Sequence, residues 1–267
     1  MSFRLNPTFG QELRDSTRAK VGMWVSSGST VNAEICAGSG LDWLLIDGEH
    51  SPLSLASIQA QLQVVAAYPI TPVVRVPVAD TALIKQYLDL GAQNLLIPMV
   101  HTAEEAAHAA AATRYPPEGV RGVGSALARA ARWNRVDGYL QNSNRDHVSV
   151  IAQIESAEAV ENALEICQTP GVDAIFIGPS DLAASMGHIG QQAHPDVVAN
   201  IRRAIAAARE AGIPVGINAF DPKLARGYID DGIDFILVGA DVAILARQSE
   251  ALAAAYISDS GEERASY

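Results

Sequence analysis

Eight short apolar runs alternate with amphipathic segments along this chain, a pattern that predicts an α/β fold closed into a single (β/α)8 barrel, or TIM barrel. The length of 267 residues agrees, because such barrels typically contain about 250 residues. Gly91, Gly212 and Gly232 each follow a helical segment directly, where a left-handed cap is expected before the next strand. An open, doubly wound sheet is the alternative, and eight regular units favour closure.

A leading helix is expected at Phe9–Ala19, before the alternation begins. The strands are expected where short apolar runs occur, at Lys20–Val25, Trp43–Asp47, Pro72–Val76, Asn94–Pro98, Val148–Glu155, Ala174–Gly178, Pro214–Asn218 and Phe235–Gly239. Helices fill the gaps, as at Ser54–Ala67, Thr81–Leu90, Ala103–Thr113, Ala157–Cys167, Pro195–Ala211 and Pro222–Asp231.

One long irregular connection runs from Tyr115 to Asp146. It is punctuated by turn-forming residues, namely Pro116, Pro117, Gly119, Gly122 and Gly124. We interpret it as an ordered excursion, because no Ser/Gly-rich linker marks a domain boundary anywhere. Residues 1–267 are therefore predicted to form one barrel domain, with a frayed polar tail at Ser258–Tyr267.

The composition limits the possible partners of the chain. A net charge of −11 and a pI near 4.9 disfavour nucleic acid and anionic membranes, and they favour a bound divalent cation. No apolar stretch approaches the roughly 18 residues of a membrane helix, and Met1–Lys20 lacks the pattern of a secretory signal. Cys36 and Cys167 are expected to be reduced core residues, which predicts a cytoplasmic protein.

Two carboxylates follow neighbouring predicted strands. Glu155 ends one apolar run, and Asp181 follows the next run after Gly178-Pro179-Ser180. Because parallel strands end at the same edge of a sheet, these carboxylates are expected to converge on one Mg²⁺ or Mn²⁺ ion. The alternative is that both residues cap the helices that follow them, and Asp181 suits that role well.

Other polar residues lie at strand ends, where barrel enzymes place their functional groups. His50 follows Asp47 across a glycine turn, so the Asp47 carboxylate could hold the ring and make it a general base; the alternative is a plain turn with a surface histidine. Arg75 interrupts an apolar strand and is expected to bind a substrate oxygen that gains charge, or to pair with Asp47 or Glu49.

Two other kinds of chemistry are disfavoured. Val238–Asp241 offers backbone amides to a phosphate, but the Asp241 carboxylate would repel it. A Schiff-base mechanism needs a buried lysine near the strand ends. The chain has only Lys20, at the wrong end of its strand, and Lys85 and Lys223 in helices, so a metal-dependent route to an enolate is favoured.

Several motifs in order resemble the HpcH/HpaI aldolases over about residues 20–254. They are Trp43–His50, Leu95–Val100, Arg114–Pro117 with Arg121–Arg129, Gln153–Glu155 and Phe176–Leu182. The resemblance implies a class II pyruvate aldolase, which cleaves 4-hydroxy-2-oxoacids reversibly to pyruvate, or a related oxoacid such as hydroxypyruvate, and an aldehyde.

The resemblance also implies a role for each matching residue. Glu155 and Asp181 match metal ligands, with Mg²⁺ or Mn²⁺ expected and Co²⁺, Ni²⁺ or Zn²⁺ as further candidates. Arg75 matches the arginine on the keto oxygen, and His50, supported by Asp47, matches the general base. Substrate-pocket positions are Gln153, Trp24 and the backbone at Gly178, Pro179 and Ser180.

The family further implies a hexamer built from dimers that exchange their last helices, here about Asp241–Ala254. The loop Asn218–Phe220 would then influence the preferred aldehyde. Two alternatives are an acyl-CoA ester lyase of the citrate-lyase β type and a barrel that binds oxoacids without turnover. The acyl-CoA lyase would need a basic groove, and none is visible in so acidic a chain.

Overall fold

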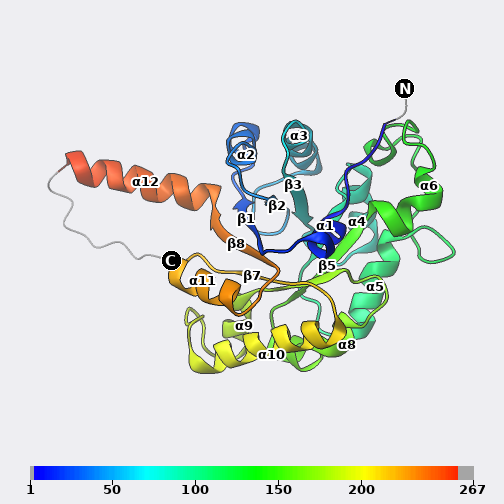
Figure 1. Ribbon diagram of the computed structural model, residues 1–267. Coiled ribbons are helices and arrows are strands. Elements are labelled where there is room, and N and C mark those ends of the chain that lie inside the picture. Colours follow the sequence, from blue (N-terminus) through cyan, green and yellow to red (C-terminus); the bar gives the residue numbers. More distant parts are fainter. Residues whose placement is uncertain (1–2, 258–267) are drawn as a thin grey trace.

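The computed structural model describes residues 3–257 and contains eight parallel strands that close into one barrel (Figure 1). The strands are β1 (Lys20–Val25), β2 (Trp43–Asp47), β3 (Thr71–Arg75), β4 (Asn94–Ile97), β5 (Ser149–Ile154), β6 (Ala174–Ile177), β7 (Val215–Asn218) and β8 (Phe235–Ala240). Each strand pairs with its neighbours in sequence, and β8 pairs with β1. The closed barrel and all eight strands are confirmed, and the open sheet is wrong.

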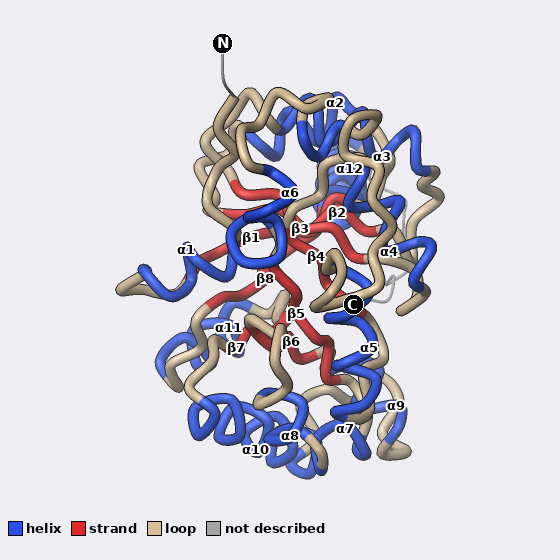
Figure 2. Tube along the Cα trace, turned by 90° about the vertical axis from the view of Figure 1, so that its right-hand side faces the viewer, coloured by secondary structure: helices blue, strands red, loops and turns tan. Residues whose placement is uncertain are grey.

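Helices surround the strands (Figure 2). They are α1 (Phe9–Asp15), α2 (Thr30–Ala37), α3 (Leu55–Val65), α4 (Thr81–Asp89), α5 (Ala103–Thr113), α6 (Tyr139–Asn142), α7 (Ala157–Glu161), α8 (Ala163–Cys167), α9 (Pro179–Ser185), α10 (Pro195–Ala211), α11 (Pro222–Asp230) and α12 (Asp241–Tyr256), with a short 3-10 helix η1 (Arg129–Ala131) and a short π-helix η2 (Ser143–His147). The expected tail Ser258–Tyr267 lies outside the described residues.

Two helix predictions are wrong in extent. The leading helix ends at Asp15, because Ser16 is extended (φ −81°, ψ 141°) and its hydroxyl donates to the carbonyl of Arg18. The expected single helix at 157–167 is two short helices. Asn162 breaks it with φ −91° and ψ 5°, and its side chain donates to the carbonyl of His101.

The predicted glycine caps are confirmed, with positive φ at Gly91 (95°), Gly212 (73°) and Gly232 (84°). Gly212 is the clearest case, since it ends the 17-residue helix α10 and donates its N–H to carbonyls of the last turn.

Aromatic side chains fill the end of the barrel where the strands begin. Phe9 of α1 is fully buried, and its ring lies 5.0 Å from that of Trp43 and 5.4 Å from that of Phe235. The backbone N–H of Phe9 donates to the side-chain oxygen of Asn94, the first residue of β4. Helix α1 therefore closes this end, and side chains at the carboxyl ends of the strands face the open end.

The connection from Tyr115 to Asp146 leads from α5 to β5, so it lies at the edge where strands begin. Arg121 is almost fully buried there, pairs with Asp89 of α4 at 2.9 Å and stacks on the Tyr115 ring. These contacts tie the connection to the helical layer. The Arg121–Arg129 motif therefore lies at the opposite edge from the carboxylates discussed below.

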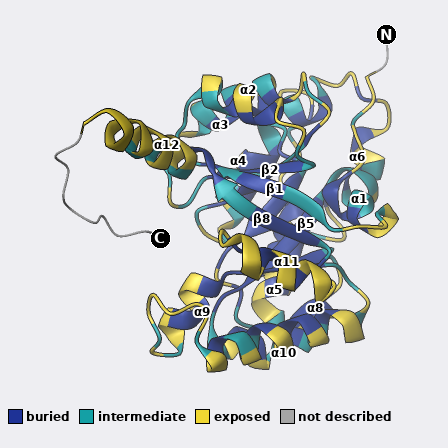
Figure 3. Cartoon of the chain, turned by 60° about the vertical axis from the view of Figure 1, so that its left-hand side comes forward, coloured by how far each residue is buried: buried dark blue, intermediate teal, exposed yellow. Residues whose placement is uncertain are grey.

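Helix α12 projects away from the barrel (Figure 1), and its surface is exposed along almost its whole length (Figure 3). Asp241 is its only buried residue. The exposed residues include large apolar side chains, namely Val242, Ile244, Leu245, Leu252 and Tyr256. Among residues 3–257, no helix is both long and apolar enough to cross a membrane.

Candidate active site

Four polar side chains that the sequence singled out are buried at the carboxyl ends of the strands. Asp47 ends β2 and Arg75 ends β3, and the two are partners in the register of these strands. Gln153 lies near the end of β5, and Glu155 follows it. Each of the four is at most 5% exposed. Burial of so many polar groups requires compensating contacts.

Arg75 is held by two carboxylates and an aromatic face. Its Nε donates to Oδ1 of Asp47 at 2.9 Å, and its Nη1 lies 2.9 Å from Oε2 of Glu49. The guanidinium carbon stands 4.4 Å from the centre of the Trp24 ring. Both structural pairings considered for Arg75 are therefore present. They fix the guanidinium in one orientation. A group that stabilises charge developing during a reaction must be held in this way.

Burial alone would raise the pKa of Asp47. The hydrogen bond and charge of Arg75, together with the backbone N–H groups of Glu49 and His50, hold that pKa below its usual range. The pKa of Glu49 is instead raised, chiefly by burial, with Asp47 and Asp181 adding to the effect. The sequence suggests Glu49 only as an ion-pair partner of Arg75, whereas its location in the structure makes it an additional member of the site.

Glu155 is fixed by two hydrogen bonds. Its Oε1 accepts from the backbone N–H of Met99 at 2.8 Å, and its Oε2 accepts from Nε2 of Gln153 at 2.5 Å. Met99 has a positive φ of 54°, which is uncommon for a residue with a side chain. The loop after β4 thus aims an amide at Glu155. Sequence reasoning missed this contact, since a methionine gives no signal of a left-handed conformation.

The pKa of Glu155 is raised to about 7. Burial is the main cause; Asp181 and Glu49 add to it, while the Met99 N–H and the charge of Arg75 oppose it. Asp181 therefore lies within electrostatic range of both Glu155 and Glu49. The carboxylates at the strand ends therefore lie close enough together to repel one another.

The capping alternative is wrong for Glu155. Helix α7 is capped by Ser156, whose hydroxyl accepts from the N–H of Ala159. For Asp181 the outcome is mixed: Gly178 is the N-cap of α9, and Asp181 is an exposed residue of its first turn. A carboxylate there interacts favourably with the helix dipole. No hydrogen bond joins the Asp181 side chain to any residue between 3 and 257.

The expected contact between the Asp47 carboxylate and the His50 ring is wrong. Asp47 Oδ1 accepts from the backbone N–H groups of Glu49 (3.1 Å) and His50 (3.3 Å), as in an Asx turn. This tight turn requires glycine at position 48, because an added Cβ there would lie only 2.5 Å from the carbonyl oxygen of Arg75. The His50 side chain is 70% exposed, with Nε2 3.9 Å from Glu49 Oε2.

The remaining predicted positions border this site. The indole N–H of Trp24 donates to Oδ1 of Asn218 at 2.8 Å. Oε1 of Gln153 is buried without a hydrogen-bond partner in the described part of the chain. The absence of a side chain at Gly178 lets its backbone lie close to Glu155 and Gln153. An added Cβ there would lie 2.8 Å from Glu155 Oε2 and 3.0 Å from Gln153 Nε2.

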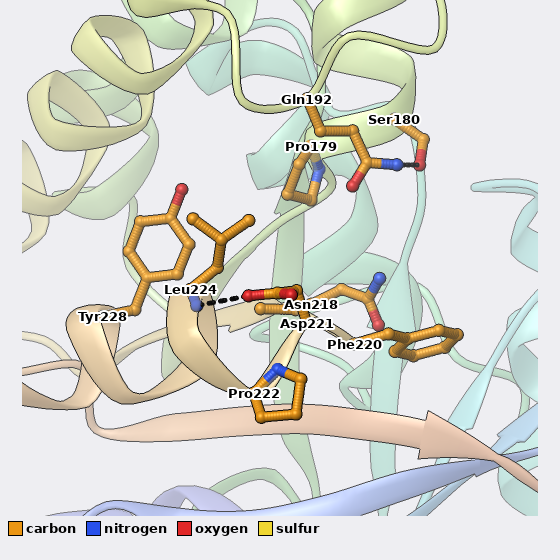
Figure 4. Close-up of a pocket in the computed structure, with 10 residues that line it drawn as sticks. Pro179, Ser180, Gln192, Asn218, Phe220, Asp221, Pro222, Leu224 and Tyr228 are labelled. Atoms are coloured by element: carbon orange, nitrogen blue, oxygen red, sulfur yellow. Dashed lines mark hydrogen bonds between the residues drawn. The ribbon is translucent and has the colours of Figure 1, made fainter. Parts of the chain in front are cut away.

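A cavity of about 570 Å³ lies beside these groups (Figure 4). Pro179 and Ser180 line it from α9, Asn218 lines it from the end of β7, and Phe220 lines it from the loop that follows. In Figure 4 the Ser180 hydroxyl accepts a hydrogen bond from the Gln192 amide at 2.7 Å. The cavity is lined by both regions that the sequence associates with substrate binding.

The donor set fits a hard divalent cation. Glu155 and Asp181 offer carboxylate oxygens, and Mg²⁺ typically binds one or two protein carboxylates together with water and substrate. The raised pKa of Glu155 also favours a cation here, because a positive charge would offset the repulsion among the carboxylates. Glu155 and Asp181 do not belong to a set of three close ligand groups in residues 3–257. Such a set is not required for an ion that keeps open positions.

The chemistries disfavoured from the sequence find no support. Asp241 Oδ1 accepts from the N–H groups of Ser26 and Val242, both at 2.8 Å, so its carboxylate occupies the amides that a phosphate would need. Lys20 opens β1 at the closed end, 3.9 Å from Asp42. Lys85 lies in α4 and Lys223 in α11, as expected.

Comparison with known proteins gives consistent matches. The family model described as HpcH/HpaI aldolase/citrate lyase matches residues 20–247. The chain is 52% identical over 259 residues to a hydroxypyruvate/pyruvate aldolase of Deinococcus radiodurans, covering 97% of this chain and 93% of the relative. It is 51% identical over 239 residues to a 4-hydroxy-2-oxo-heptane-1,7-dioate aldolase of Escherichia coli, covering 90% and 91%.

A solved structure from Burkholderia cenocepacia J2315, described as an HpcH/HpaI aldolase/citrate lyase family protein, superposes with a TM-score of 0.88. It is 44% identical in sequence, and the match covers 92% of this chain and 97% of that one. The agreement extends over the whole barrel.

Proposed function

The chain belongs to the HpcH/HpaI aldolase/citrate lyase family and is an aldolase, a carbon–carbon lyase, and from this premise we propose that it cleaves 4-hydroxy-2-oxoacids in a divalent-metal-dependent reaction. The products are an aldehyde and pyruvate or a related 2-oxoacid such as hydroxypyruvate. One observation carries the proposal: a buried carboxylate of raised pKa, Glu155, lies within electrostatic range of a rigidly held guanidinium, Arg75.

Glu155 and Asp181 are the residues that would hold the metal, with Mg²⁺ or Mn²⁺ preferred and Co²⁺, Ni²⁺ or Zn²⁺ as further candidates. When bound, the ion supplies Lewis-acid stabilisation of negative charge. The contacts of Glu155 with Met99 and Gln153 support this assignment, because they fix the carboxylate before any ligand arrives.

Arg75 binds the keto oxygen of the substrate. This oxygen gains negative charge as the C3–C4 bond breaks and its electron pair moves into the enolate. Asp47, Glu49 and the Trp24 ring hold the guanidinium in place, so little reorganisation is needed during the reaction. Nη2 of Arg75 has no hydrogen bond with any described residue, which leaves a donor for the substrate.

His50 is the general base. Its ring accepts the proton of the 4-hydroxyl group, the C3–C4 bond breaks, the aldehyde departs, and a proton is then delivered to C3 of the enolate. Aldol addition is the reverse path. The exposed ring and the nearby Glu49 carboxylate support this role. Asp47 acts through the backbone of the turn that carries His50, and not through the ring.

The substrate occupies the space between these groups and the cavity beside α9. Gln153 offers its unpaired Oε1 to a hydroxyl group of the substrate, and Trp24 covers the guanidinium. The oxoacid carboxylate binds at the turn Gly178-Pro179-Ser180 and accepts from the backbone N–H of Ser180, since the N–H of Gly178 donates to the carbonyl of Ile154 and Pro179 has none. The cavity lined by Asn218 and Phe220 accommodates the aldehyde portion, so this loop influences acceptor preference.

The protein forms a homohexamer, a trimer of dimers, in which partners exchange α12. The exposed apolar side chains along this projecting helix support an oligomer, since a helix with no covered face is unfavourable in water. Sedimentation velocity provides the test: deletion of residues 241–257 should yield smaller species. The buried, free cysteines Cys36 and Cys167 support a cytoplasmic location.

Exchange of the C3 protons of pyruvate in D₂O, followed by NMR, tests the function directly. Metal-depleted protein should exchange slowly, Mg²⁺ or Mn²⁺ should restore exchange, and EDTA should abolish it. Exchange that is indifferent to metal would contradict the proposal. Turnover of an acyl-CoA ester would favour the citrate-lyase β alternative, and pyruvate binding without exchange or cleavage would favour a non-catalytic barrel. A panel of aldehydes with pyruvate and hydroxypyruvate then identifies the preferred substrates.

A further inference from the structure

The loop that joins α9 to α10 brings two histidines and a carboxylate together, outside the site described above. The rings of His188 and His194 are stacked, with centroids 3.7 Å apart and planes 16° apart. His188 Nε2 and His194 Nδ1 each lie 3.7 Å from Oδ2 of Asp196. The three residues are the one such set of potential metal ligands in residues 3–257, with ligand atoms within 4.8 Å of one another.

We propose that His188, His194 and Asp196 form a second metal site, specific for a transition-metal ion such as Zn²⁺, Ni²⁺, Co²⁺ or Cu²⁺. Imidazole nitrogens suit these ions, whereas Mg²⁺ and Ca²⁺ prefer oxygen ligands. Ligand atoms of a tetrahedral ion with bonds of about 2.0–2.1 Å lie roughly 3.3 Å apart. The two observed separations of 3.7 Å are therefore close to those of a bound site.

The loop that carries His188 can make the small movement that would bring the ligand atoms to metal-binding distances. Gly187 and Gly190 flank His188 with positive φ values of 79° and 75°, and nothing lies within 4 Å of an added Cβ at either. The parallel rings must splay slightly so that both nitrogens point at one ion.

One feature of the cluster opposes the binding of a cation. His194 is the N-cap of α10, and its Nδ1 accepts a long hydrogen bond of 3.3 Å from the N–H of Asp196, which a metal ion bound to the same lone pair would replace. The positive end of a helix disfavours a cation. Asp196 stands in the first turn and offsets this effect, which makes its carboxylate essential to the site. We therefore expect loss of Asp196 alone to abolish most of the binding.

The cluster is connected to the catalytic mouth through the same loop. Gln192 lies between the two histidines and donates to the hydroxyl of Ser180, the residue before Asp181. An ion at the cluster would link the loop to α10 and hold Gln192 at the cavity wall. The metal site nevertheless stands independently of the aldolase proposal, because it shares no ligand with Glu155 and Asp181.

Titration calorimetry with Zn²⁺ on untagged, metal-free protein tests the site. The variant E155Q/D181N removes the predicted catalytic ligands and should still bind one Zn²⁺ per chain. Adding H188A/H194A to it should weaken that binding at least about 100-fold, since even outer-shell ligand partners contribute 10- to 100-fold. H108A removes an exposed histidine of α5 and should leave binding unchanged. Mg²⁺ should not occupy the cluster.

Anomalous diffraction at the zinc edge locates the ion. A peak between His188, His194 and Asp196 in crystals of E155Q/D181N is the expected result. Failure of E155Q/D181N to bind Zn²⁺, or binding that survives removal of both histidines, would overturn the second site. Neither result bears on metal-dependent pyruvate exchange, so the two proposals fail separately.

Discussion

Lowering the pH should weaken Mg²⁺ binding, because a proton competes with the ion for Glu155. The pKa of this carboxyl is about 7, raised by burial, Asp181 and Glu49. A metal ligand must be deprotonated before it binds. With a pKa of about 7, Glu155 is about 90% ionised at pH 8, about 50% at pH 7 and about 10% at pH 6. The Kd for Mg²⁺ should therefore be about tenfold higher at pH 6 than at pH 8.

Calorimetry measures both parts of this prediction. The Kd follows from titrations at pH 6, 7 and 8, and titration in two buffers of different ionisation enthalpy gives the protons released. About 0.5 proton should be released per Mg²⁺ at pH 7. E210Q alters an exposed glutamate of α10 and should keep the wild-type profile. A Kd that is equal at pH 6 and pH 8, without proton release, would refute a raised pKa at Glu155 or its role as a ligand.

The same shift predicts how the metal-free protein responds to pH. The folded-state pKa of Glu155 lies above its usual 4.5, so the folded state binds more protons between these values, and stability falls as pH rises from 4.5 to 7. A rise from 4.5 to about 7 corresponds to about 3 kcal/mol. E155Q removes this titration, so its unfolding free energy should fall less over the same range. Parallel pH profiles for both proteins would contradict the reasoning.

Three further changes test other parts of the site. Arg75→Ala should slow metal-dependent pyruvate exchange by about 10²–10³-fold, the effect of losing one oxyanion donor, with an unchanged circular dichroism spectrum; wild-type exchange would remove Arg75 from the mechanism. Gly178→Ala should weaken Mg²⁺ binding, because its Cβ would lie 2.8 Å from Glu155 Oε2, whereas Gly227→Ala, with nothing within 4 Å, should not; equal binding by the two variants would argue against this packing. His50→Ala should slow retro-aldol cleavage by about 10²–10⁴-fold with little change in the Kd for Mg²⁺; an equal loss of metal affinity would make His50 a ligand or a structural support.

The barrel was predictable because its strands are buried on both faces. Continuous apolar runs with glycine caps before them leave little freedom in where each strand begins and ends. The helices were less predictable, because their ends depend on contacts that are distant in sequence. Asn162 interrupts an otherwise helical segment by donating to the carbonyl of His101, and composition alone gives no sign of that contact.

The candidate site was predictable to a similar degree. Burial of Arg75 and Glu155 follows from polar residues at the ends of apolar strands. The orientation of His50 was not predictable, since an aspartate before a glycine can bind either a ring or backbone amides, and here it binds the amides. The Met99 amide was hidden for a different reason. Its positive φ is imposed by the fold and not encoded by its side chain.

The balance of charge at the strand ends explains why the metal site and the substrate-binding guanidinium depend on one another. Three carboxylates, those of Asp47, Glu49 and Glu155, interact with the guanidinium of Arg75, and the carboxylate of Asp181 adds a fourth negative charge near Glu49 and Glu155. An oxoacid brings another negative charge into a protein whose net charge is already −11. Arg75 is engaged by two of the carboxylates, so it cannot neutralise the site alone. A dication between Glu155 and Asp181 would offset their charges and allow an anionic substrate to approach the guanidinium.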